Sequence, residues 1–147
     1  VMGSPGYHFE TIPNQDLFIS RKNARKVFKN ILDPVRKIRF YNNPLYLDFL
    51  RGEQEYQCTA WSNPTYTVMG WREPCYLLGD RHTQDVNDLY EDAIWEKYGV
   101  GNDPRCANCL MHCGFESASI FSAMKSPKAA IKLIKEGAVQ NSGVGAG

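Results

Sequence analysis

The five cysteines constrain this chain most, because three of them fall within eight residues. Two residues separate Cys106 from Cys109, and three more lead to Cys113. A Cys-x2-Cys pair is a chelating unit for zinc or for an iron–sulfur cluster. Clustered thiols that bind nothing would repel one another as thiolates and would oxidise when exposed. The spacing therefore favours a metal-binding loop over buried free cysteines that act as small apolar side chains.

The compartment decides whether these thiols are free to bind metal. Five is an odd number, which argues against a closed set of disulfides. The first residues, 1–7, have neither the basic region nor the apolar region of a secretory signal. We therefore expect reduced thiols in a cytoplasmic protein.

The other two cysteines extend the pattern. Cys58 is followed by eleven residues, Gly70, four residues and Cys75. This pattern resembles the opening of the SPASM and twitch domains, which follow radical S-adenosylmethionine (SAM) barrels and continue with a Cys-x2-Cys pair. The further Cys-x5-Cys step of a full SPASM domain is missing. The resemblance therefore implies one auxiliary [4Fe–4S] cluster rather than two.

Longer stretches between Gly3 and about Ala123 make the resemblance more specific. They are similar to the C-terminal region of the adenosyl-hopene transferases, radical SAM enzymes of hopanoid biosynthesis. The matching stretches are Ser4–Tyr7, Leu45–Leu50, Cys58–Thr65, Gly70–Leu78 and Arg105–Glu116.

The resemblance implies an α+β chain in three parts. Residues 1–52 would be the last elements of a partial α/β radical SAM barrel, and 53–125 a small twitch-like iron–sulfur domain of a hairpin and helices. Residues 126–147 would be a terminal helix and a disordered tail. In such an enzyme a second [4Fe–4S] cluster and SAM generate a 5′-deoxyadenosyl radical, which adds to the alkene of a hopene-like lipid.

One departure limits what this chain is expected to do alone. The cluster that binds SAM needs a Cys-x3-Cys-x2-Cys loop, and the sequence has none. We therefore expect SAM and the lipid to bind through a missing N-terminal half, and the isolated chain to be inactive. No residue of this chain is predicted to be catalytic.

Four thiolates complete a [4Fe–4S] cluster, so one of Cys58, Cys75, Cys106, Cys109 and Cys113 should be spare. Cys58 and Cys75 lie far apart in sequence, and Cys106 and Cys109 form the chelating pair. Cys113 is therefore the least certain ligand, although a Cys-x3-Cys span could also reach one cluster. Because Cys113 precedes a predicted helix start, we expect a lowered thiol pKa.

A basic helix is predicted near the N-terminus. Ser20 is a suitable N-cap, and an apolar stripe follows up to Pro34, made of Ala24, Val27, Phe28, Ile31 and Leu32. Five basic residues between Arg21 and Lys29 fall outside the stripe, which predicts a solvated face. The alternative is contact of helix 20–33 with anionic lipid at the inner face of the membrane. The net charge of +1 does not point to nucleic acid.

Shorter patterns predict the remaining elements. They are a strand at Ile38–Tyr41, a helical turn at Leu45–Leu50 ended by Gly52, a hairpin of Tyr56–Trp61 with Thr65–Met69, a strand at Cys75–Leu78, a helix from the Thr83 cap to Gly99, helices at Phe115–Met124 and Pro127–Glu136, and no structure from Gly137 to Gly147.

Three interpretations remain open. His112 could hydrogen-bond to a cluster sulfur, or it could be a partly exposed histidine without a role. Five aromatic residues could line a pocket for a polycyclic hydrocarbon or could fill a small core. Finally, four cysteines could hold zinc in a structural or interaction module. The aromatic residues are Tyr56, Trp61, Tyr66, Trp71 and Tyr76.

Overall fold

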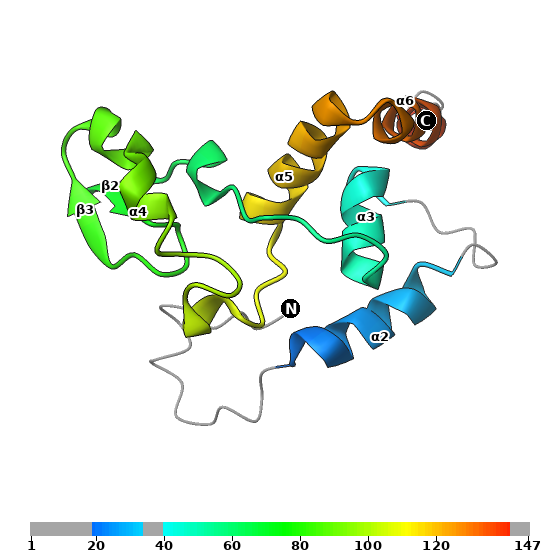
Figure 1. The fold of residues 1–147 in the computed structure, drawn as a ribbon, viewed down its shortest axis with the longest axis horizontal. Helices are drawn as coiled ribbons and strands as arrows, with labels where there is room; N and C mark the ends of the chain where they lie inside the picture. Colours follow the sequence, from blue (N-terminus) through cyan, green and yellow to red (C-terminus); the bar gives the residue numbers. More distant parts are fainter. Residues whose placement is uncertain (1–18, 34–39, 142–147) are drawn as a thin grey trace.

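The computed structural model describes residues 19–33 and 40–141, without the side chains of 92–93 and 137–141. Figure 1 shows a small sheet and the short helix α4 (Asp92–Trp95) at one end of the molecule. The other end holds the helices α2 (Arg21–Ile31), α3 (Pro44–Arg51), α5 (His112–Lys125) and α6 (Pro127–Asn141). The described fold is therefore α+β, as predicted. A radical SAM barrel is not seen in the described ranges, and residues 1–18 of its predicted remnant lie outside them.

Helix α2 (Arg21–Ile31) begins where the sequence predicts, because Ser20 Oγ accepts a hydrogen bond from the Asn23 backbone N–H. Its buried face differs from the predicted stripe. Val27 is 45% exposed, whereas the Arg21 and Arg25 side chains are only 13% and 21% exposed. The prediction that all five basic residues face solvent is therefore wrong for these two.

Helix α3 (Pro44–Arg51) matches the predicted helical turn. Asn43 caps its first turn through its side chain, and Gly52 ends it at a φ of 77°. The centre of the core is Phe49, which is fully buried and stacks on Phe115 at 4.4 Å between ring centroids. The buried residues of this core are Ala24, Leu32, Tyr46, Phe49, Leu50, Leu110 and Phe115. Residues on both sides of the predicted boundary at 52 and 53 thus share one core.

The sheet has three antiparallel strands, β1 (Tyr66–Thr67), β2 (Gly70–Glu73) and β3 (Arg81–Thr83), in that order. The predicted hairpin of Tyr56–Trp61 with Thr65–Met69 is wrong. The first segment is irregular and ends in the 3₁₀ helix η3 (Ala60–Ser62), while β1 pairs with β2, Thr67 opposite Gly70. The predicted strand at Ile38–Tyr41 lies mostly outside the described residues, and Phe40 and Tyr41 are not in a strand.

Two further predictions between β2 and residue 99 are wrong. Cys75–Leu78 forms a turn, because the Gly79 N–H donates to the Cys75 carbonyl at 3.2 Å. Thr83 ends β3 instead of capping a helix. The predicted helix is divided into the 3₁₀ helix η4 (Val86–Tyr90), which Asp85 caps, and the short α4 (Asp92–Trp95).

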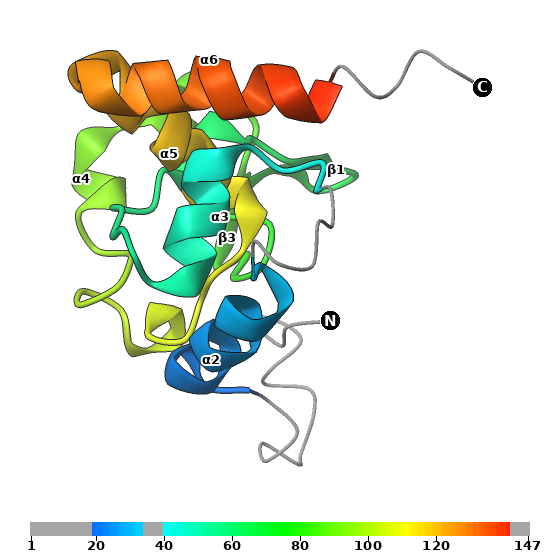
Figure 2. The same ribbon diagram turned by 90° about the vertical axis from the view of Figure 1, so that its right-hand side faces the viewer.

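The two C-terminal helices are confirmed and are longer than predicted. Helix α5 (His112–Lys125) starts at His112 instead of Phe115, and α6 (Pro127–Asn141) continues past Gly137. Lys132 on α6 donates to the buried Asp48 carboxylate on α3 at 2.5 Å, which fixes α6 over the core (Figure 2). No helix within the described ranges is both long and apolar enough to cross a membrane.

Tyr46 connects α3 to the cysteine-rich segment, because its hydroxyl donates to the buried Leu110 carbonyl at 2.8 Å. Tyr46→Phe should lower the free energy of unfolding by about 1–3 kcal/mol, since the carbonyl loses its partner without access to water. Urea denaturation measures the change. Tyr41→Phe is the control, because Tyr41 is fully exposed. Equal stability of the two variants would show that the buried hydrogen bond contributes nothing.

Candidate metal centre

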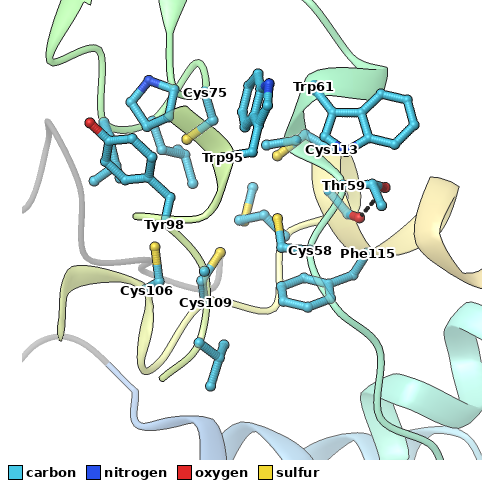
Figure 3. A pocket seen from close by; sticks show the side chains of 18 of the residues that line it. Cys58, Thr59, Trp61, Cys75, Trp95, Tyr98, Cys106, Cys109, Cys113 and Phe115 are labelled. Atoms are coloured by element: carbon cyan, nitrogen blue, oxygen red, sulfur yellow. Dashed lines mark hydrogen bonds between the residues drawn. The ribbon is translucent and has the colours of Figure 1, made fainter. Parts of the chain in front are cut away.

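All five cysteines line one pocket of about 330 Å³ between the sheet and the helices (Figure 3). They come from three separate segments, around Cys58, around Cys75 and from Cys106 to Cys113. Cys113 is buried and the other four are partly buried. The fold thus brings together every residue that the sequence predicts as a metal ligand.

Cys58 lies directly against the start of α5. The next residue, Thr59, donates its backbone N–H and its hydroxyl to the Gly114 carbonyl, each at 3.0 Å. A β-carbon added at Gly114 would collide with Cys58 Sγ, so the sulfur occupies the space that any side chain at 114 would fill. The glycine after Cys113 is therefore part of the site.

Cys75 is placed by the end of β2 and the turn that follows it. The glycine of the Cys-x11-Gly-x4-Cys pattern begins β2 with a φ of 114°, and a β-carbon there would press on the Thr83 carbonyl of β3. Only glycine adopts this conformation without strain. Gly70 thus allows β2 and β3 to pair closely, and this pairing positions Cys75.

Cys106 and Cys109 lie on a tight turn after the 3₁₀ helix η5 (Pro104–Cys106), in which the Cys109 N–H donates to the Cys106 carbonyl at 3.0 Å. Helix α2 holds this turn from the other side. Arg21 Nη1 donates to the Cys109 carbonyl at 2.8 Å, and the Arg21 backbone N–H donates to Asn108 Oδ1 at 3.0 Å. The Arg21 guanidinium also lies over the Phe49 ring, 5.0 Å from its centroid.

An arginine joins the turn to the sheet. Arg105 donates to both oxygens of Asp80 at 2.7 Å, and its Nη2 also donates to Asp103 at 2.7 Å. These hydrogen bonds lower the pKa of both carboxyl groups. Because the three charges are held together, the Cys106 segment is fixed relative to the segment that follows Cys75.

Burial is the main influence on the metal-free thiols. It raises the pKa of Cys58 and Cys75, that of Cys106 to about 11 and that of Cys113 to about 12. The negative charge of neighbouring thiolates, Cys109 among them, adds to the increase at all four thiols. The prediction of a lowered pKa at Cys113 is wrong, because desolvation outweighs the field of the helix start.

Backbone hydrogen bonds act in the opposite direction at four of the sulfurs. Ala60 supplies one to Cys58, Leu77 and Leu78 supply two to Cys75, and Gly99 supplies one to Cys106. Gly114 does the same for Cys113. Such bonds stabilise thiolates, which are the form that binds metal.

Aromatic rings make up much of the remaining wall, but few of them are the predicted ones. Of the predicted set, only Trp61 lines the pocket, together with Trp95, Tyr98 and Phe115. The polar atoms of two rings are bound elsewhere, since Trp95 Nε1 donates to the Leu89 carbonyl and the Tyr98 hydroxyl donates to Asp80. His112, the proposed sulfur partner, is exposed.

Several residues of the site have no direct signal in the sequence. Trp95 and Tyr98 lie in the segment predicted as a helix from the Thr83 cap to Gly99, and their spacing of three is the available hint. The sequence predicts a solvated Arg21, because its partners lie far away along the chain. The glycine that follows Cys113 is the local feature of the sequence that fits the close packing of Cys58 against α5.

The pocket fits a cluster better than a single ion. Four thiolates around zinc each lie about 2.3 Å from the metal, so their sulfurs nearly touch. In the described part of the chain, no three His, Cys, Asp or Glu side chains are grouped that tightly. Thiolates around a [4Fe–4S] cluster each bind a different iron and are spread further apart. All five thiols line one pocket of about 330 Å³, which leaves room for a group larger than a single ion.

Comparisons with known proteins give one family. A family model described as a domain of unknown function, DUF3463, matches residues 1–133. The match includes every cysteine and extends beyond Met124. No curated protein and no solved structure matches the chain.

Proposed function

The chain belongs to the DUF3463 family, and we propose that it is the auxiliary-cluster part of a radical SAM enzyme of the adenosyl-hopene transferase type. The family is associated with radical SAM-related proteins, which supports the proposal that the whole enzyme is a radical SAM enzyme. The observation that carries it is the gathering of all five cysteines around one pocket of about 330 Å³. The stretches that resemble adenosyl-hopene transferases support the more specific proposal that the enzyme is of that type.

Four of the five thiols would hold a [4Fe–4S] cluster, and Cys113 is the least certain of them. When bound, such a cluster supplies one-electron redox capacity and a rigid covalent anchor for its ligands. The chain's own part is to position the thiols and to exclude water. Arg21 and Arg105 hold the Cys106–Cys109 turn from two sides, while Trp61, Trp95 and Phe115 provide an apolar wall.

The substrate part of the proposal belongs to the whole enzyme. One-electron reduction of SAM would give methionine and a 5′-deoxyadenosyl radical, which would add to the alkene of a hopene-like lipid. The resulting carbon radical would take up a hydrogen atom from a reduced donor, so the overall addition would consume one electron and one hydrogen atom per SAM. SAM and its own cluster need a Cys-x3-Cys-x2-Cys loop, which these residues do not contain.

Anaerobic reconstitution tests the cluster. The purified chain, incubated with ferrous iron, sulfide and dithiothreitol, should retain about four irons and about four sulfides per chain. It should be brown, with a broad absorbance shoulder that dithionite bleaches. Metal and sulfide analysis after desalting gives the stoichiometry.

The competing function is a zinc-binding structural or interaction module. Four cysteines favour it chemically, because structural zinc sites commonly use four thiolates. Purification from cells grown with both metals separates the two proposals. A colourless chain with one zinc and no sulfide, which also fails to take up iron anaerobically, would overturn the cluster assignment.

A further inference from the structure

A second concave site lies on the opposite side of the cysteine turn from the pocket. It is a cleft of about 610 Å³ between α2, the end of α3 and Asn108. Six cationic side chains line it, and no acidic residue is among its described lining. The six are Arg21, Lys22, Arg25, Lys26, Lys29 and Arg51.

The cations of the cleft fall into two groups. The arginines already form ion pairs. Arg21 and Arg25 both pair with Glu55, and Arg51 pairs with Asp48 and Glu53. The three lysines recur at i, i+4 and i+7 along α2, so they lie on one side of the helix. All three are exposed, and none forms an ion pair with another described residue.

The floor of the cleft has more donors than acceptors. Arg25 Nε, Arg25 Nη2 and Arg51 Nε have no acceptor within the described ranges, but they are shielded from solvent, so an occupant of the cleft does not reach them directly. At the rim, the Ser20 hydroxyl and the Asn108 amide N–H₂ add neutral donors, because the oxygen of each is already an acceptor. The accessible positive charge of the cleft is that of its three lysines, which together with these neutral donors favours an anion with several acceptor oxygens.

We propose that this cleft binds a phosphate group. A phosphate presents several oxygens and up to two negative charges, which matches three exposed lysines on one side of the cleft better than a single carboxylate would. The group could belong to a small phosphorylated molecule or to a phospholipid headgroup, since the chemistry of recognition is the same. The site does not depend on the cluster, and either assignment can fail without the other.

The test uses two probes and two charge-matched variants of the full chain. Pyrophosphate binding is measured by calorimetry, and vesicle binding by co-sedimentation with phosphatidylcholine alone or mixed with phosphatidylglycerol. One variant carries Lys22→Gln, Lys26→Gln and Lys29→Gln. The control carries Lys125→Gln, Lys128→Gln and Lys135→Gln, which removes three exposed charges near α6, at the far side of the molecule (Figure 2). Arg21 and Arg25 stay unchanged because they pack on Phe49.

We expect the α2 variant to bind its probe at least about tenfold more weakly, because three favourable charge pairs are lost. The control should stay within about twofold of the unmodified chain, and both should keep their circular dichroism spectra. Pyrophosphate binding identifies a small phosphorylated ligand. Binding only to vesicles with phosphatidylglycerol identifies a lipid headgroup. Failure to bind either probe, or equal weakening by both variants, would overturn the proposal.

Discussion

Gly114→Ala should abolish most cluster binding, although alanine is the better helix former by about 1 kcal/mol. The added β-carbon collides with Cys58 Sγ, so either the sulfur or the start of α5 must move. In the metal-free chain the same substitution should cost about 1–3 kcal/mol of unfolding free energy, the usual range for overpacking. Iron and sulfide content and urea denaturation measure the two effects.

A second substitution provides the control for this prediction. In a Cys58→Ala background the colliding sulfur is absent, so Gly114→Ala should be neutral or stabilising. The double-mutant cycle therefore isolates the contact between these two residues from any general effect on α5. Full iron and sulfide in Gly114→Ala would show that Cys58 is not held at this position in the loaded protein.

Cys109→Ala should lose the four-iron cluster, whereas Cys113→Ala should keep it. Cys109 lines the pocket and belongs to the chelating pair, and its turn is held by Arg21. Loss of a thiolate from this position would leave the cluster open on one side, to be degraded or reduced to a three-iron form. Cys113 is the candidate spare thiol, because the other four already complete the ligand set.

Single Cys→Ala variants at all five positions, scored for iron, sulfide and electron paramagnetic resonance, test this assignment. Cys113 is buried and faces the same pocket, so the comparison with Cys106 is the decisive one. Loss of iron from Cys113→Ala, with full iron in Cys106→Ala, would make Cys106 the spare residue. Full iron in Cys109→Ala would remove Cys109 from the ligand set.

Much of the helical structure could be predicted from the sequence, because local signals determine it. Ser20 caps α2 and Gly52 ends α3 through interactions within a few residues. The cysteines could be predicted as one site, since their spacing is a chemical pattern. Burial then corrected the expected pKa of Cys113, which depends on the surroundings and not on its place in a helix.

The errors arose where a segment pairs with a distant partner. The Tyr56–Trp61 segment has the composition of a strand, but Thr59 bonds to Gly114 instead of to a neighbouring strand. Arg21 and Arg25 face inward because both form ion pairs with Glu55 and lie over the Phe49 ring. Both outcomes depend on contacts more than twenty residues apart, which a periodicity does not reveal.

The origin of the thiols in three segments has a consequence for how the protein matures in the cell. The ribosome produces Cys58 and Cys75 well before the segment that carries Cys106, Cys109 and Cys113. The pocket cannot close until that last segment has emerged and docked on α2 and α3 through Arg21 and Tyr46. The ligand set of the proposed cluster is therefore complete only after the last segment has been made, and a ribosome-bound chain that ends before Cys106 would carry two thiols without a completed site.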